Sequence, residues 1–449
     1  MTTVPSGIGE AISAYSKRQV ESAYRKVTFK ILPLIIIAYI VAYIDRVNVG
    51  FAKLQFLHDL QFSEAIYGLG AGLFFIGYML FEVPSNLLLE RVGARVTLTR
   101  IMIIWGLISI GMAFISTPTQ FYVMRFLLGA AEAGFFPGVI LYLSYWFPAP
   151  RRARIVALFA MGGALAGIIG SPLSGWLLSL DGTHGLHGWQ ILFIYEGLPA
   201  VLLGVFTYCY LDEKPEQVKW LDRSEKAIVV GALSAESQGT ATGARSHGKF
   251  RHVLRDPKVY AAAIAYIAVI AGTSTLGLWA PTLFKRMGTD ASMIGILTGA
   301  PYIIAVISMY LVGRNSDRTQ ERRWHYACSM FAAGVSVIML GLGAENIWIT
   351  MALLTVASCG VWSSLAVFWT IPLAYLNGSA KAGGIALISS IGALGGFISP
   401  TIVGWVTTRT GSLYLGLAAI GMLLILSAVI LLLSVGPNPQ GNSHAVSGR

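Results

Sequence analysis

The sequence predicts an all-α integral membrane protein in which twelve transmembrane helices form two six-helix bundles. Three observations predict this class. The 449 residues are 55% hydrophobic and only 12% charged, with a mean hydropathy of +0.68, far outside the composition of soluble domains. Twelve stretches approach the roughly 20 apolar residues that a helix needs to cross a bilayer. The two halves of the chain also repeat each other's motifs at a nearly constant offset.

Each predicted span is long enough for one crossing, and a single long hydrophilic connection separates the sixth span from the seventh. The spans cover residues 31–53, 65–89, 96–116, 120–147, 153–179, 189–211, 258–283, 292–313, 324–343, 346–375, 382–407 and 412–435. The chain is therefore divided into an N-terminal segment (1–30), a first bundle (31–211), a linker (212–257), a second bundle (258–435) and a tail (436–449). Residues 1–30 are basic and polar, so we expect no cleavable signal there.

The linker has two parts with different expected structures. Its beginning, up to Glu236, has the pattern of an amphipathic helix that lies on the membrane surface. The Gly/Ser/Thr-rich residues 237–249 are typical of a flexible connection.

The positive charge is distributed by side of the membrane. With twelve spans, 26 of the 32 Lys and Arg residues fall on the side of the two termini and 4 on the other side. This bias follows the positive-inside rule and predicts cytoplasmic termini of a multi-pass inner-membrane protein. The net charge of +11 is thus explained by topology, and we expect no nucleic-acid partner.

The repeat supports an ancient duplication of a six-helix unit. Residues 90–91 (Glu-Arg), after the second span, match residues 317–318 (Asp-Arg), after the eighth, at an offset of 227. Residues 171–172 and 399–400, both Ser-Pro, match at an offset of 228. Parallel repeats that enclose a site at the membrane midplane are typical of transporters that alternate access to that site.

Ionisable residues inside the predicted spans point to the site. Residues 121–154 read as one helix that carries Arg125 and Glu132 seven positions apart, on one face. A charged side chain near the bilayer centre costs roughly 2.5–3.5 kcal/mol. Such a residue is usually kept because it serves a function. Asp45 and Arg46, in the first span, lie at a depth in the membrane similar to that of Arg125. Adjacent helical residues point about 100° apart, so we expect Asp45 to pair with Arg125 and Arg46 to face the central cavity.

These residues suggest a division of labour between the halves. A guanidinium facing the cavity can hold a carboxylate through two hydrogen bonds, which makes Arg46 the candidate anion site. Glu132, near the midplane, is the best proton site, because poor solvation favours a neutral carboxyl group; Asp45 and Arg125 would share in proton coupling. A purely structural ion pair is the alternative for Asp45 and Arg125, and a packing hydrogen bond is the alternative for Glu132.

The interiors of the second-half spans lack ionisable acids and bases, so we expect them to contact the uncharged part of a substrate. Trp369 and Ser390 are the candidates there, with Tyr78 as a cavity hydroxyl from the first half; core packing is the alternative for all three. Glu196 is expected to be structural. Charges near the cytoplasmic ends are candidates for an inner gate, namely Glu82, Glu90, Arg91, Arg95, Asp317 and Arg318.

Other functions find no support in the motifs. The sequence has no HExxH, nucleophile elbow or nucleotide-binding loop, and no catalytic residue, metal site or cofactor is predicted. Its three cysteines lie in apolar spans without metal-ligand spacing and are expected to pack in the core. The expected partners are a small organic anion, protons and the lipid bilayer.

Several segments resemble the major facilitator superfamily and, within it, the anion:cation symporter family. They are YIDRVNVGFA (43–52), FEVPSNLLLERVGAR (81–95), RFLLGAAEAGFFPG (125–138), GLHGWQILFIYEGLPA (185–200) and SIGALGGFISP (390–400). The chain is most similar to the branch of tartrate, phthalate and hydroxyphenylacetate permeases, over about residues 25–435.

The resemblance implies proton-coupled uptake of organic carboxylates, with the first-span Arg binding the anion and the acidic positions coupling protons. Alternatives with the same fold are an anion exchanger, a sodium symporter and an exporter. A monomer suffices for this mechanism.

Overall fold

The structure, a computed structural model, describes residues 15–243, 256–340, 346–375 and 379–434. Every regular element in these ranges is a helix, which confirms the predicted all-α class. Eleven helices or helix pairs among them are long and apolar enough to cross a membrane. The remaining predicted span, 324–343, corresponds to α15 (Arg323–Leu340), which is less apolar because it begins with Arg323, Trp324 and His325. Its predicted last residues, 341–343, lie outside the described ranges.

The first half of the chain forms a bundle whose helices begin at residues suited to capping. Ser16 and Thr117 each form a capping box with the Gln three positions later, and Ser63 accepts a hydrogen bond from the backbone of Ile66. The helices are α2 (Lys17–Val47), α3 (Val49–Asp59), α4 (Glu64–Val92), α5 (Ala94–Gly111), α6 (Pro118–Glu132), α7 (Phe135–Ser144), α8 (Ala149–Ala160), α9 (Gly162–Ser179) and α10 (Gly188–Tyr210).

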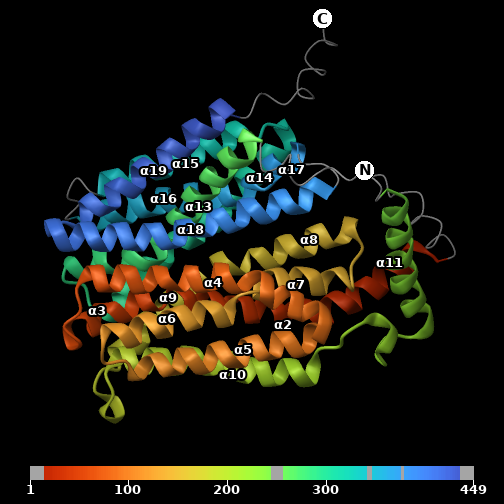
Figure 1. Cartoon of the computed structure of the whole chain (residues 1–449), viewed down its shortest axis with the longest axis horizontal. Coiled ribbons are helices and arrows are strands. Elements are labelled where there is room, and N and C mark those ends of the chain that lie inside the picture. The colour runs from red at the N-terminus through yellow and green to blue at the C-terminus, as the bar shows by residue number, and fades with distance from the viewer. Residues whose placement is uncertain (1–14, 244–255, 341–345, 376–378, 435–449) are drawn as a thin grey trace, which may run out of the picture.

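The second half forms a similar bundle, stacked on the first in Figure 1. The bounds of α4 and α14 differ by 227 at both ends, the same offset that relates the sequence motifs. The helices of this half are α13 (Pro257–Arg286), α14 (Ala291–Thr319), α15, α16 (Ile347–Phe368), α17 (Thr370–Tyr375), α18 (Ser379–Thr410) and α19 (Leu413–Ser434).

A surface helix, α11 (Arg223–Gly243), follows the first bundle and crosses one end of it (Figure 1). Ion pairs attach it to α2 and α8, with Lys26 Nζ 2.5 Å from Glu225 and Arg152 2.6 Å from Glu236. The helix runs beyond Glu236 to Gly243, so the beginning of the predicted flexible segment is helical instead. The rest of that segment, 244–249, lies outside the described residues.

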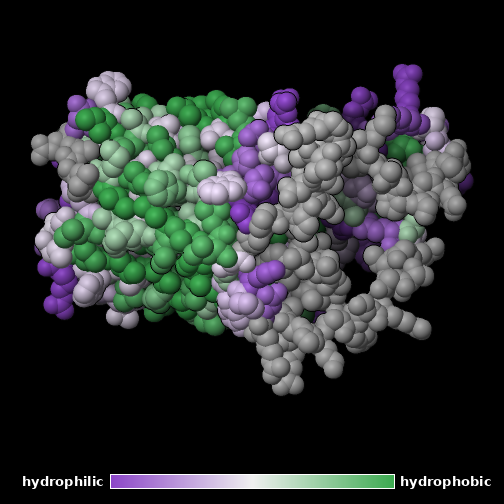
Figure 2. Space-filling view, turned by 90° about the horizontal axis from the view of Figure 1, so that it is seen from above, coloured by the Kyte–Doolittle hydropathy of each residue, from purple (hydrophilic) through white to green (hydrophobic). Residues whose placement is uncertain are grey.

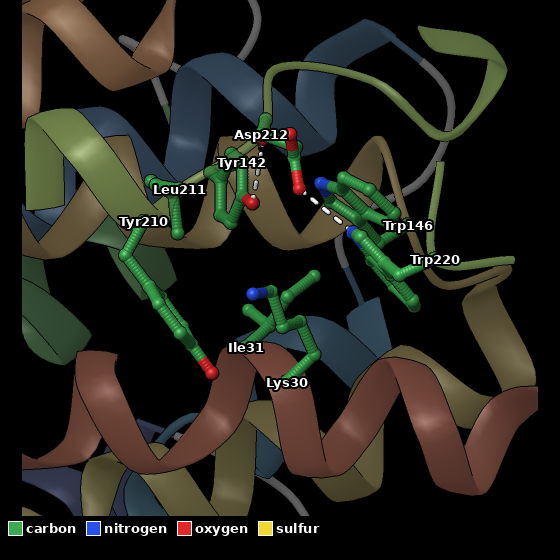
Figure 3. A pocket seen from close by; sticks show the side chains of 8 residues that line it. All are labelled: Lys30, Ile31, Tyr142, Trp146, Tyr210, Leu211, Asp212 and Trp220. Carbon is green, nitrogen blue, oxygen red and sulfur yellow. Dashed lines mark hydrogen bonds between the residues drawn. The ribbon is translucent and has the colours of Figure 1, made fainter. Parts of the chain in front are cut away.

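The start of the linker is fastened to the first bundle by an aromatic cluster (Figure 3). The Trp220 indole N–H donates to the Asp212 carboxylate over 2.7 Å, and the Tyr142 hydroxyl donates to the Asp212 backbone carbonyl over 2.9 Å. The rings of Trp146 and Trp220 stack with centroids 5.7 Å apart. These contacts fix the linker where the chain leaves α10.

The two halves touch along α4 and α18, α9 and α14, and α3 and α13. Their backbones approach closely where glycine leaves room: a Cβ on Gly68 would lie 2.2 Å from the carbonyl oxygen of Pro400, and one on Gly175 would lie 2.8 Å from the Cα of Gly295. These residues lie at the end of the molecule where α4 and α14 begin. We call it the closed end.

The outer surface matches a lipid environment. Figure 2 shows hydrophobic residues forming a broad belt over the visible face, with hydrophilic residues gathered towards its two ends. Across the two bundles, large apolar side chains such as Leu202, Ile307 and Met422 are more than half exposed. Such a belt is what a membrane-spanning bundle presents to the hydrocarbon core.

Candidate functional site

The predicted single helix over residues 121–154 is divided into three helices, with one break at Ala133 and Gly134 and another between Ser144 and Ala149. Gly134 adopts a left-handed conformation (φ 86°), and a Cβ there would lie 2.5 Å from the Ser85 hydroxyl. A residue with a side chain is disfavoured in both respects, so the sequence supplies glycine at this turn. The break makes Glu132 the last residue of α6.

Glu132 forms an ion pair with Arg46 of α2, between its Oε1 and a terminal guanidinium nitrogen. The Glu132 side chain is 2% exposed, whereas 21% of the Arg46 side chain remains accessible. The predicted pair of Asp45 with Arg125 is not formed, and the prediction was wrong on this point. Adjacent residues of α2 do point in different directions, but it is Arg46 that faces α6.

Asp45 is directed towards α5 and towards the kink between α2 and α3. Its Oδ1 accepts hydrogen bonds from the Ser109 hydroxyl and, over 3.1 Å, from the Asn48 amide. Asp45 is only 1% exposed. Neutral donors from the nearest elements thus reach Oδ1, while the buried Oδ2 has no hydrogen-bond partner among the described residues.

Arg125 is completely buried, and all three of its guanidinium nitrogens lack a hydrogen-bond partner in the part of the chain that the structure describes. The Phe74 ring lies 5.0 Å from its guanidinium carbon and 5.4 Å from that of Arg46. An aromatic face stabilises a cation, but it does not replace the hydrogen bonds that a guanidinium forms with an anion. Arg125 interacts electrostatically with Asp45 and Glu132.

The Tyr78 ring centre lies 5.2 Å from the Arg46 guanidinium, and its role as a cavity hydroxyl stays a prediction. Glu82, one turn further along α4, is half-buried. Its carboxylate forms no ion pair among the described residues. Glu82 interacts electrostatically with Arg46 instead.

The second half contributes aromatic rings. The predicted substrate residue Trp369, between α16 and α17, meets Tyr266 of α13 edge to face, with centroids 4.9 Å apart. Tyr266 also interacts electrostatically with Arg46 of the first half. Ser390 is half-buried on α18. The motifs did not single out Tyr266, since aromatic residues are common in these spans.

The predicted inner-gate charges are dispersed at the end opposite the closed end. Arg91 and Arg318 are exposed, and Asp317 pairs with Arg322 over 2.7 Å rather than with its neighbour. The side chain of Glu90 lies outside the described part of the structure. These charges make no ion pair between the halves among the residues described.

Glu213, which the sequence patterns did not single out, organises the loop between α4 and α5. Its carboxylate accepts hydrogen bonds from the backbone N–H groups of Ala94 (2.5 Å) and Arg95 (3.0 Å), at the start of α5. Negative charge at a helix N-terminus is favourable. The guanidinium of Arg95 in turn lies 4.7 Å from the Tyr208 ring centre.

Lys53, also missed by the motif patterns, connects the two halves at the closed end. Its ammonium lies 2.9 Å from the Glu64 carboxylate, 4.3 Å from the Tyr67 ring centre and 3.6 Å from the Trp279 ring centre. The Tyr67 hydroxyl donates to the backbone carbonyl of Leu278 over 3.1 Å. Lys53 and Tyr67 belong to the first half, and Trp279 and Leu278 to the second.

A family model described as Major Facilitator Superfamily matches residues 35–400 and 262–448. The chain therefore belongs to this superfamily, and it is a multi-pass membrane transporter of small organic molecules rather than an enzyme.

The named relatives of this chain are also transporters. A protein of Agrobacterium vitis named "Putative tartrate transporter" is 46% identical over 93% of this chain and 92% of its own length. An Acinetobacter baumannii protein named "Quinolone resistance transporter" is 42% identical over 90% of this chain and 93% of its own. The crystal structure of a bacterial homologue of the human lysosomal transporter Spinster covers 90% of this chain and 96% of its own, with a TM-score of 0.74 at 16% identity. That similarity concerns the fold.

Proposed function

We propose that this protein imports an organic carboxylate together with protons, by alternating access. The observation that carries this proposal is the ion pair between Arg46 and Glu132, which joins a partly accessible guanidinium to a buried carboxyl group. A proton-coupled anion carrier needs an anion site whose availability depends on a proton. In this pair, Arg46 can serve as the anion site and Glu132 as the proton site.

The coupling follows from charge balance. Without substrate, the Glu132 carboxylate neutralises Arg46. A proton on Glu132 removes that negative charge, and the guanidinium is then free to hold a substrate carboxylate through two parallel hydrogen bonds. The substrate's charge replaces that of Glu132, so the loaded carrier reorients without an additional unpaired charge. Each uncompensated charge would be driven or opposed by roughly 2.3 kcal/mol per 100 mV.

Arg125 and Asp45 can compensate a second substrate charge in the same way. Arg125 interacts with Asp45 and Glu132 without a direct hydrogen bond to either. Protonation of Asp45 leaves the positive charge of Arg125 less compensated and favours a second negative group nearby. One proton suffices for a monocarboxylate to cross without net charge, whereas a dicarboxylate needs two.

The uncharged part of the substrate would contact Tyr78, Trp369 and Ser390. The name of the Agrobacterium vitis relative favours a dicarboxylate such as tartrate. Aromatic acids and sugar acids are the other carboxylates to test, because the aromatic residues of the second half suit a ring or the apolar face of a sugar.

We further propose that residues 31–211 and 258–435 are the two bodies that rock against each other, in a monomer whose termini are cytoplasmic. The closed end then faces the outside, and the conformation described here opens towards the cytoplasm. Glu82, Glu90, Arg91, Arg95, Asp317 and Arg318 would hold the inner gate in the opposite conformation.

Uptake into proteoliposomes under an imposed inward proton gradient tests the proposal. Tartrate, phthalate, hydroxyphenylacetate and a sugar acid would be offered to the wild type, Glu132→Gln, Arg46→Ala and, as a control, the exposed-residue variant Glu216→Gln. One acid should accumulate in the wild type and the control. Glu132→Gln should retain exchange but lose accumulation, and Arg46→Ala should lose both.

Each alternative mode of transport has its own outcome. Accumulation that follows a sodium gradient at constant pH would make the protein a sodium symporter. Exchange without accumulation in the wild type would make it an anion exchanger, and extrusion driven by the proton gradient would make it an exporter. If no acid moves at any pH, the carboxylate proposal is wrong.

A further inference from the structure

A third carboxyl group lies in the interior of the first half, apart from the Arg46–Glu132 pair. Glu196 of α10 is only 3% exposed. Its Oε1 accepts a hydrogen bond from the Ser174 hydroxyl over 2.6 Å, while its buried Oε2 has no partner among the described residues. No cation pairs with it there. An ionised carboxylate in such surroundings costs several kcal/mol, since little replaces the water it has lost.

Asn48 lies between Glu196 and Asp45. Its amide N–H donates to Asp45 Oδ1 over 3.1 Å, and the Asn48 side chain also interacts with Glu196, although no hydrogen bond joins the two among the described residues. The Asn48 Oδ1 is buried and has no partner in the described structure. A carboxylate and an amide carbonyl are both acceptors, so Glu196 Oε2 and Asn48 Oδ1 cannot satisfy each other unless the carboxyl group is protonated.

The balance of buried acidic and basic groups also points to Glu196. The interior of the first half holds three buried carboxyl groups and two guanidinium groups within its described residues. Glu132 is paired with Arg46, and Asp45 receives two hydrogen bonds and the attraction of Arg125. Glu196 receives one hydrogen bond, from Ser174, and has no guanidinium of its own, while the buried Oδ2 of Asp45 also lacks a partner among the described residues. If all three acids were ionised, the group would carry one uncompensated negative charge in a low-dielectric region, which is unfavourable.

We propose that Glu196 is a second proton-binding site, in which the proton sits on Oε2 and is donated to Asn48 Oδ1. Oε1 is then the carbonyl oxygen that accepts the Ser174 hydroxyl. The two unpartnered oxygens satisfy each other, and Asn48 links the state of Glu196 to Asp45. This inference rests on the proposed function in one respect: in proton-coupled transport, this proton is the second one that a dicarboxylate requires.

The neighbouring elements leave this site with few other titratable groups. α2 contributes the titratable Asp45, whereas α5 and α9 contribute the neutral hydroxyl groups of Ser109 and Ser174. Lys53, on α3, is bonded to Glu64. His58 and Asp59 lie further along α3, where they contact each other at its end.

The position of the site suggests how the proton enters. Ser174 directly precedes Gly175, whose backbone packs against Gly295 of the second half. The carboxyl group is therefore just behind the contact that seals the closed end. Separation of α9 from α14 would open this contact, so the proton is exchanged when the closed end opens.

Infrared difference spectroscopy of the full-length protein in lipid nanodiscs tests proton binding without substrate or transport. The wild type should show a carboxylic-acid C=O band at neutral pH that shifts in D₂O. Glu196→Gln should abolish this band, and Glu216→Gln, at an exposed position, should retain it. Ser174→Ala keeps the acid but removes the donor to its carbonyl oxygen, so the band should move to higher frequency. This variant preserves the test if Glu196→Gln does not fold.

Transport then measures the coupling. For a dicarboxylate at zero membrane potential, the logarithm of the accumulation ratio rises with the pH difference in proportion to the protons carried, and Glu196→Gln should lower that slope by one proton per substrate. An unchanged band in Glu196→Gln overturns the site, and a wild-type band that sodium removes at fixed pH assigns it to sodium instead. A lost band with an unchanged slope overturns the coupling role. Failure of the proposed function is distinct, because wild-type uptake would then ignore the proton gradient while the band remains.

Discussion

The ammonium nitrogen of Lys53 lies 3.6 Å from the centre of the Trp279 ring and so joins α3 of the first half to α13 of the second. Lys53 is 2% exposed. Its ionic partner, Glu64, belongs to the same half as Lys53, so that bond can persist in every conformation. If the two halves separate there as proposed, the contact with Trp279, in contrast, breaks.

The Lys53–Trp279 contact should therefore bias the conformational equilibrium. A desolvated cation–π contact contributes about 2 kcal/mol, so Trp279→Leu should shift the equilibrium towards opening of the closed end by roughly 30-fold. The shift is measurable by electron–electron resonance between spin labels at His58 and Arg286, after replacement of the three native cysteines. A longer distance should become populated.

The matched control for this shift is Trp348→Leu, which removes a tryptophan whose side chain is 76% exposed at the start of α16. It should leave the distance distribution unchanged. Lys53→Met should produce the same shift as Trp279→Leu, and the double variant should add little to either. Full additivity of the two substitutions would show that Lys53 and Trp279 act independently.

Arg46 should not be replaceable by lysine. A guanidinium holds a carboxylate through two parallel hydrogen bonds, whereas an ammonium is a point charge without that geometry. Loss of one charged hydrogen bond costs about 1.5–3 kcal/mol, so Arg46→Lys should raise the apparent KM for the carboxylate by roughly 10- to 100-fold. Uptake kinetics in proteoliposomes measure this change. An unaltered KM would place the substrate carboxylate elsewhere.

The N-terminus of α11 should be sensitive to acid. The Asp222 carboxylate accepts a hydrogen bond from the backbone N–H of Glu225 (2.8 Å) and one from the Ser224 hydroxyl (2.7 Å), and these bonds lower the pKa of Asp222 below its ordinary value of 3.8. A depressed pKa contributes stability above the unfolded pKa and loses it as the pH falls through the folded one. Fraying of α11 should therefore increase below pH 3.8.

Hydrogen exchange at the Glu225 amide as a function of pH measures this fraying, after correction for intrinsic exchange. Asp222→Asn is the matched control, because asparagine also caps helices but does not titrate in this range. It should remove the pH dependence of the protection. If Asp222→Asn retains the acid response, another group is responsible for it.

The sequence anticipated those features that depend on hydropathy and spacing. The all-helical class and eleven of the twelve predicted spans are of this kind. Depth along a helix decides which residues are level with one another, but it does not decide how each helix is rotated. The pairing of Asp45 with Arg125 was inferred from depth, whereas the long Arg46 side chain reaches Glu132 at the end of α6.

The contacts of Lys53 and Glu213 are unpredictable for a different reason. Each joins segments far apart in the chain: Lys53 meets Trp279, and Glu213 caps the helix that begins at Ala94. No local pattern specifies such partners. The interaction of Glu196 with Asn48 is of the same kind, since α10 and the end of α2 are far apart in the sequence.

The break after Glu132 should be essential to the geometry of the site. Gly134→Ala would force a side chain into a left-handed conformation, at a cost of about 1–2 kcal/mol, and would set its Cβ against Ser85. The end of α6 must then shift, and Glu132 moves with it away from Arg46. We expect a lower melting temperature and a loss of proton-driven accumulation. Gly138→Ala, in the regular part of α7 against the flexible tip of Leu89, should be tolerated; equal loss in both variants would mean that general packing matters and the break does not.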